Sequence, residues 1–484
     1  MKAKWPISMF VLMLLVSLMN PASAAEETRS LQDESIYDVL VDRYFNKQIQ
    51  NDFNVNGSDP AAFTGGDFEG LVSEIGHIQE MGFTVLSVGP VFSADTYDGK
   101  QVIDYSKLER HFGTSEEFQA LIEKSHDLDM KIIIDVPTQQ LSPNHVWAAE
   151  NPDWFMDNED GTVALDLSNP EAQKALASTF VDFAENYKID GLRLQSADRL
   201  DPKFIEEFSA AMKNVRSMYI LSDQEMEPVA GLDAVVAPGV EKALRDTYKN
   251  FDQDEAALVE VMGETENELI RVDSLLTSRF TSDIVKDKGY PPTRWNLLFT
   301  QLLTMPGIPV VQYGSEIAMN GEAVPESHQI LDLGVEQELV DHITNLMSLR
   351  NSSEALRVGE LEMLHEEDGW LVYKRSNEDE TWIVAINNSS ETKSISLPAD
   401  IVGSDKEIRG LFENDIVRQE ANGEYQITLD REVAETFHVT EERGFNKAYI
   451  AALIVLYVVF LVFLRIVWKK GKQRKADEAA KSKE

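Results

Sequence analysis

Short apolar segments alternate with amphipathic segments along most of the chain. Residues 131–136, Lys-Ile-Ile-Ile-Asp-Val, have the composition of a buried strand, whereas residues 170–186 place their apolar positions at helical spacing. The two patterns differ because strands repeat every two residues and helices about every 3.6. Further strands are expected at 36–43, 84–90, 190–195, 218–222, around 275 and at 308–313, and further helices at 65–81, 115–128, 202–214, 240–249, 254–266, 294–304 and 336–350.

This alternation predicts parallel βαβ units across residues 25–355. Their number fits a (β/α)8 TIM barrel better than an open sheet, and no Gly-x-Gly-x-x-Gly phosphate loop follows a strand. From residue 356 to 438 the pattern changes to short alternating segments separated by turn residues, as at 369–373 and 381–386. The fold class is therefore α/β, with a barrel followed by a C-terminal antiparallel β-sandwich.

Both ends of the chain carry membrane or export signals. Residues 1–24 combine two lysines, an apolar run and Ala22-Ser23-Ala24, which predicts a cleaved signal peptide. After a stalk at 439–447, residues 448–468 are apolar enough for a transmembrane helix, and 469–484 form a basic tail. Because basic residues stay on the cytoplasmic side, we expect a single-pass type I protein of the cell membrane with its large domain extracytoplasmic.

Charge and cysteine content restrict the chemistry. The net charge is −40 and no long basic stretch lies in the interior, so nucleic acid is not an expected partner. The chain has no cysteine, which excludes disulfides and thiolate metal sites.

The most informative stretch is 190–195, Asp-Gly-Leu-Arg-Leu-Gln. Arg193 and Gln195 are two positions apart on the expected strand, so their side chains point the same way. In a barrel of parallel strands, functional groups lie at the carboxyl ends of the strands, and these two residues would face a common site.

Several stretches together resemble the α-amylase family of glycoside hydrolases, glycoside hydrolase family 13. They cover residues 35–435 and include Gly-Gly-Asp-Phe at 65–68, the segment 104–114, the strand end at 190–195 and Thr-Met-Pro-Gly-Ile-Pro-Val-Val-Gln-Tyr-Gly-Ser-Glu at 304–316. The anchored architecture is similar to membrane-attached amylase-like proteins of bacilli. The resemblance implies a TIM barrel whose reaction retains configuration and needs two carboxyl groups about 5 Å apart.

The resemblance also implies that the catalytic residues are replaced. The family's nucleophile position is Gln195, its acid/base position is Asp223 and its third carboxylate is Leu276. The positions equivalent to the family's sugar-binding residues are Arg193, Asp135, Gln140, Leu275, Asp98 and Lys100. With its anionic neighbour gone, Arg193 is expected to pair with Asp135 or Asp223. Leu275 and Leu276 would give the cleft an apolar floor.

No cofactor is expected. Asp166 resembles a calcium-ligand position of the family and is the remaining candidate, but Gln139 stands where the family has a calcium-associated asparagine. Asp198 lies at an odd spacing from Gln195 and is expected on the loop before the next helix, as a solvated or helix-capping carboxylate.

Three functions remain open from the sequence. The first is an inactive pseudo-glycosidase that acts as a binding or assembly module for a membrane or cell-surface protein. The second is a glycan-binding receptor that kept the cleft. The third is a residual or altered α-glucan hydrolase or transferase relying on Asp223.

Overall fold

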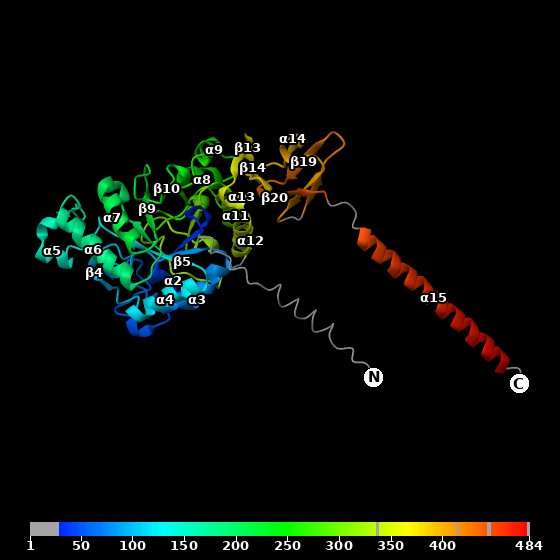
Figure 1. Cartoon of the computed structure of the whole chain (residues 1–484), viewed down its shortest axis with the longest axis horizontal. Coiled ribbons are helices and arrows are strands. Elements are labelled where there is room, and N and C mark those ends of the chain that lie inside the picture. The colour runs from blue at the N-terminus through cyan, green and yellow to red at the C-terminus, as the bar shows by residue number, and fades with distance from the viewer. Residues whose placement is uncertain (1–28, 335–337, 413–414, 443–446, 482–484) are drawn as a thin grey trace, which may run out of the picture. The chain divides into compact units, whose positions relative to one another are not determined.

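The computed structural model describes residues 29–334, 338–412, 415–442 and 447–481. Eight parallel strands close into a barrel in the order β1-β12-β11-β10-β9-β8-β5-β2 (Figure 1). They are β1 (Ile36–Asp38), β2 (Val85–Ser87), β5 (Lys131–Val136), β8 (Gly191–Leu194), β9 (Tyr219–Glu225), β10 (Ala234–Val236), β11 (Leu269–Ile270) and β12 (Ile308–Gln312). The predicted TIM barrel is confirmed, while the expected signal peptide at 1–24 lies outside the described residues.

Helices follow the strands in the chain and have recognisable start signals. α4 begins with a capping box between Thr114 and Glu117, and α6 begins at Pro170 after the Asn169 cap. The helices of the barrel are α3 (Phe68–Glu80), α4 (Ser115–Asp127), α6 (Pro170–Asn186), α7 (Pro202–Val215), α8 (Val240–Tyr248), α9 (Ala256–Met262), α10 (Phe280–Lys286), α11 (Pro291–Thr304) and α12 (Glu338–Ser352).

The barrel interior is apolar in its lower layers and polar at the top. Ile36, Val85, Ile133, Leu221 and Val310 are buried in one cluster inside the barrel. Because inward positions repeat every two residues, the next inward residues toward the carboxyl ends are polar or charged. The fold therefore places a buried polar layer at the carboxyl ends of the strands, directly next to the apolar core of the barrel.

Three parts of the barrel differ in kind from the expected pattern. The segment expected as one strand at 36–43 is β1 followed by a helical turn, α2 (Val41–Tyr44), in which the Asp42 carboxylate accepts the backbone N–H groups of Thr64 and Gly65. β10 was not expected, since three residues carry no measurable periodicity. β11 ends at Ile270, so Leu275 lies in a turn beyond the strand.

Two hairpins interrupt the βα alternation. β3 (Phe92–Ala94) pairs with β4 (Val102–Leu108), and the turn between them carries Asp98 and Lys100. β6 (Phe155–Asp157) pairs with β7 (Val163–Leu165). Both are antiparallel additions between a barrel strand and its helix.

The strands after the barrel pair antiparallel, which confirms the predicted C-terminal sheet domain. The chain divides into two compact units, and the first includes residues up to Lys393 together with Asp430–Ala434. Within this first unit β13 (Glu360–Glu367), β14 (Trp370–Ser376) and β15 (Thr381–Asn387) form consecutive antiparallel pairs.

The second unit holds the remaining strands and the final helix. β17 (Lys406–Gly410) pairs with β18 (Ile416–Arg418) and β20 (Val433–Glu441), and β16 (Lys393–Pro398) lies beside β19 (Glu424–Leu429). Helix α15 (Lys447–Lys481) contains a segment, Ile450–Arg474, that is long and apolar enough to cross a membrane. Residues 443–446 of the expected stalk lie outside the described residues.

Candidate functional site

The candidate site lies at the carboxyl ends of the barrel strands, where three charged side chains meet. Asp38 ends β1, Asp135 lies near the end of β5, and Arg193 occupies the paired position on β8. The strand register sets Asp135 directly opposite Arg193. All three are inward positions, so their side chains meet at the end of the apolar core of the barrel.

Arg193 is held between two carboxylates. Its Nε and Nη2 donate to Asp135 at 2.7 and 2.9 Å, while Nη1 and Nη2 donate to Asp38 at 2.9 and 3.0 Å. Burial alone would lower the pKa of Arg193, but Asp135 and Asp38 raise it well above its ordinary value. The expected pairing with Asp135 is present, and Asp38 is a second partner that the sequence did not indicate.

Gln195 completes this polar layer. Its side-chain Nε2 donates to Asp135 Oδ2 at 2.9 Å, so Arg193 and Gln195 converge on the same carboxylate. An amide can make this bond without charge, whereas a carboxylate at the same position would face Asp135 at short range. The structure therefore uses Gln195 as a neutral donor to Asp135.

Asp223 lies on β9 at the edge of the same layer. One carboxylate oxygen accepts the backbone N–H of Ser196 at 2.8 Å, and the side chain is only 7% exposed. Burial raises the pKa of Asp223 to about 6; Arg193 opposes this rise and Asp135 adds to it. Arg271 donates to the backbone carbonyl of Asp223 at 3.1 Å, which fixes the strand end.

The two leucines at the expected cleft floor lie in different surroundings. Leu275 is 8% exposed, whereas Leu276 is 42% exposed. Opposite them, Lys100 and Asp98 form a salt bridge of 3.5 Å. Leu275 thus fills the cleft and Leu276 lies at its rim.

Little space remains between these side chains. The cavity they enclose measures about 20 Å³, which is close to the room one water molecule needs. Among the described residues that line it, none is aromatic. Its lining consists of Asp38, Pro90, Asp98, Lys100, Asp135, Arg193, Gln195, Asp223, Arg271, Ser274, Leu275 and Leu276. A drug-sized ligand site is typically about 300–1,000 Å³, so this cleft does not admit a sugar ring in the described conformation.

The structure does not bring every predicted residue to the cleft. Gln140, expected at a sugar-binding position, is exposed and lies outside the lining. Asp198 is exposed on the short helix Ala197–Arg199, as expected of a solvated carboxylate before the next helix. Arg271, in contrast, lines the cleft although no sequence pattern selected it, and its Nε donates to Glu241 at 3.2 Å. It directly follows β11, a strand of two residues that is too short to be recognised from the sequence.

The calcium candidate is engaged locally. Asp166 Oδ1 accepts the backbone N–H of Ser168 at 3.0 Å and its hydroxyl at 2.6 Å, which is an ordinary turn. Over the described parts of the chain, no three Asp, Glu or His side chains are grouped to hold a metal ion. The residues present do not fit the calcium site that the family resemblance suggests.

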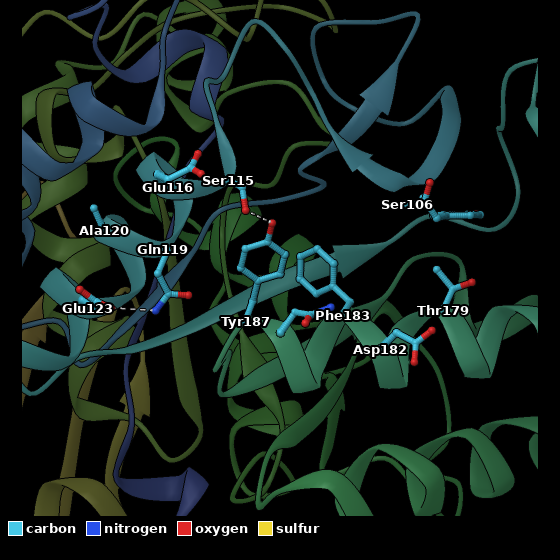
Figure 2. Close-up of a pocket in the computed structure, with 12 residues that line it drawn as sticks. Ser106, Ser115, Glu116, Gln119, Ala120, Glu123, Thr179, Asp182, Phe183 and Tyr187 are labelled. Atoms are coloured by element: carbon cyan, nitrogen blue, oxygen red, sulfur yellow. Dashed lines mark hydrogen bonds between the residues drawn. The ribbon is translucent and has the colours of Figure 1, made fainter.

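A roomier hollow lies on the outer helices. It measures about 720 Å³ and is bordered by α4 and α6 (Figure 2). Tyr187 bonds Ser115 at 2.6 Å across it, and Gln119 donates to Glu123 at 3.1 Å. Glu116, Glu123 and Asp182 make its rim acidic, and no basic side chain belongs to the described lining.

Comparison with known proteins agrees with the geometry. Residues 39–162 match the model "Alpha amylase, catalytic domain", and residues 359–437 match "Alpha-amylase C-terminal domain". The solved α-amylase of Anoxybacillus is 32% identical with a TM-score of 0.83, and covers 86% of this chain and 100% of its own. The α-amylase from Geobacillus thermoleovorans, solved with acarbose, is 31% identical with a TM-score of 0.81 and the same coverage.

A longer relative is also similar. The beta/alpha-amylase of Paenibacillus polymyxa is 26% identical over 475 residues. That alignment includes 88% of this chain but only 39% of the Paenibacillus protein. The chain therefore spans well under half the length of that relative.

Proposed function

The chain belongs to the α-amylase family of glycoside hydrolases, and on that premise we propose that it is a non-catalytic member of the family. Its barrel acts as a binding or assembly module, anchored by α15 to the cell membrane with the barrel outside the cytoplasm. The partner is another membrane or cell-surface protein. Membership of the family accounts for the fold. The residues of the cleft are the reason for proposing a role other than catalysis.

The observation that carries the proposal is the cleft itself. About 20 Å³ of space remains where the family binds and cleaves a sugar. Arg193 is neutralised by two aspartates and Gln195 bonds one of them, so these polar groups are paired with one another rather than held open for a ligand. A site arranged in this way is stable without substrate.

The replacement of the nucleophile supports the same conclusion. A retaining glycosidase forms a covalent intermediate through a carboxylate, with a second carboxyl group as acid and base. The amide of Gln195 is uncharged and its nitrogen is occupied by Asp135. Loss of a nucleophile typically removes most of the acceleration that its catalytic unit provides.

The membrane anchor is supported by composition. The segment Ile450–Arg474 has a mean hydropathy of 3.0 in its most apolar window, and its side chains are exposed. Lys469, Lys470 and Lys472 lie at its C-terminal end. This charge distribution supports a cytoplasmic tail and an extracytoplasmic barrel.

The test is hydrolysis of an activated maltooligosaccharide by the purified full-length protein beside its Asp223→Ala variant. We expect both proteins to remain at the background rate of a protein-free reaction. Turnover by the parent protein that the Asp223→Ala variant lacks would contradict the proposal.

One observation favours a second candidate, a residual α-glucan hydrolase or transferase. The pKa of Asp223 is raised to about 6, which suits a general acid near neutral pH. The hydrolysis experiment decides between the two. A glycan-binding receptor is less favoured, because sugar sites use aromatic platforms and the described lining of the cleft has none.

A further inference from the structure

A second feature of the first compact unit, which we name the acidic groove, lies away from the cleft. Three loops form it: the segment 252–255 before α9, the turn at 366–369 between β13 and β14, and residues 389–393 after β15. It measures about 670 Å³. Hydrogen bonds tie these loops together, because Asp252 accepts the backbone N–H and the hydroxyl of Ser390 at 2.8 and 2.7 Å.

The groove collects negative charge without compensation. Seven carboxylates line it against a single lysine, Lys393. None of the seven forms an ion pair with a residue that the structure describes. In the polar layer of the cleft, by contrast, Asp38 and Asp135 both pair with Arg193. The groove differs from that layer because its carboxylates form no ion pair with a described residue.

One of these carboxylates is buried. Glu255 is 5% exposed, and its Oε2 accepts the backbone N–H of Gly369 at 3.2 Å. Its Oε1 is also buried and has no hydrogen-bond partner in the described parts of the chain. Burial raises the pKa of Glu255, and Asp254 and Asp368 add to this rise. A buried carboxylate oxygen without a partner costs free energy that a bound cation would recover.

The arrangement fits several spaced cations better than one metal ion. No three acidic side chains of the described residues are grouped closely enough to hold a metal. Asp252 is committed to Ser390, and Asp254 accepts the backbone N–H of Ala256 at 2.9 Å. The remaining carboxylates, Glu366, Glu367, Asp368 and Glu391, are exposed and distributed along the groove. Ammonium and guanidinium groups are the protein cations that pair with carboxylates.

We propose that the acidic groove binds a lysine- or arginine-rich segment of a partner protein, with one basic side chain reaching Glu255. This inference rests on the proposed binding role and names the kind of partner. Charge complementarity between the groove and such a segment favours fast and selective association.

The test is fluorescence anisotropy with the full-length protein in detergent and a labelled oligolysine of about ten residues. The Glu255→Gln, Glu367→Gln double variant should weaken binding about tenfold, because it removes the buried charge and one exposed partner. Glu255→Gln retains the shape of the side chain and an acceptor for Gly369. A second double variant, Glu366→Gln with Glu367→Gln, changes only exposed residues of the groove. It should also weaken oligolysine binding, without altering any buried residue.

The matched control is the hollow of Figure 2, which is also acidic and has a similar volume. Glu116→Gln with Glu123→Gln removes the same number of charges there and should leave oligolysine binding within about twofold. Equal losses in the two double variants would overturn the proposal, since bulk acidity would then explain the binding. Displacement of the peptide by calcium at matched ionic strength would overturn it as well. The binding experiment does not depend on hydrolysis. Its failure would contradict the groove proposal alone, whereas detection of hydrolysis would contradict the proposed non-catalytic function.

Discussion

Gln195, the position expected to correspond to the family's nucleophile, donates its side-chain amide to Asp135 at 2.9 Å. Asp135 thereby accepts bonds from two neighbouring residues of one strand end, Arg193 and Gln195. The amide stabilises a layer of buried charge that an acidic residue would unbalance. Gln195 is thus a structural part of the buried polar layer of the barrel.

Gln195→Asp should not restore hydrolysis, because the cavity of about 20 Å³ remains closed to a sugar ring. It should lower the free energy of unfolding at pH 7 by about 1–3 kcal/mol, since a hydrogen bond to a buried carboxylate is lost and repulsion replaces it. Gln195→Asn is the control that keeps the amide and changes only its length. Urea denaturation and the maltooligosaccharide assay measure both effects. Hydrolysis above background by Gln195→Asp would refute the idea that the closed cleft prevents turnover.

Asp38→Asn should reduce the free energy of unfolding by about 3 kcal/mol, because it leaves the buried Arg193 with one carboxylate instead of two. Asp198→Asn, at an exposed position, should change it by less than about 0.5 kcal/mol. Denaturation of the two variants under one set of conditions gives the comparison. Equal losses of stability in the two variants would mean that the ion pair between Asp38 and Arg193 contributes nothing specific to stability.

Asp223 should make the protein less stable as the pH rises from about 4 to about 7. Its pKa in the folded state is about 6, above the ordinary value of 3.8, so the folded protein holds the proton more tightly than the unfolded chain. The ionisation of Asp223 therefore destabilises the folded state. This destabilisation is absent at a pH below the pKa of the unfolded chain, is complete above the pKa of the folded protein, and amounts to roughly 3 kcal/mol.

Asp223→Asn removes that penalty and can still accept the N–H of Ser196. The stability difference between variant and parent should therefore grow in favour of the variant between pH 4 and pH 7. Denaturation at a series of pH values measures it, with Asp198→Asn as the exposed control. A difference that does not change with pH would show that Asp223 does not titrate in this range.

Leu275 and Leu276 should respond differently to truncation. Leu275→Ala removes a buried side chain and should cost about 2–4 kcal/mol, whereas Leu276→Ala changes an exposed one and should cost less than about 1 kcal/mol. Thermal denaturation of the pair tests this assignment. Similar losses for both would indicate that Leu276 is also packed in the cleft.

The proposed topology can be mapped with single cysteines, because the chain has none. A membrane-impermeant maleimide should label Ser58→Cys in intact cells and Lys472→Cys only after permeabilisation. The cysteine-free parent provides the background. The reverse labelling pattern would place the barrel in the cytoplasm.

The strongest sequence patterns predicted the elements that position the cleft. The strand at 131–136 and the helix at 170–186 have the predicted bounds, because one is a continuous apolar run and the other has a cap and a proline at its start. The sequence indicated Asp135 or Asp223 as the partner of Arg193, and the strand register of β5 and β8 sets Asp135 opposite it. Local signals therefore located most of the polar layer.

Other parts of the site depend on packing that no local pattern reports. Asp38 was part of an expected eight-residue strand at 36–43 and had no feature that distinguished it from Asp42. Arg271 follows a strand of two residues, too short to show a period. The volume of the cleft depends on how the loops that carry Lys100 and Leu275 pack against it, and no local sequence pattern reports that packing.

The closed cleft also has a pharmacological consequence. Compounds that imitate a sugar ring inhibit enzymes of this kind by occupying the space where the substrate ring binds. Here that space is about the size of one water molecule. Such compounds should therefore inhibit an active amylase and leave this protein unaffected, so they can distinguish the action of this protein from that of an active relative.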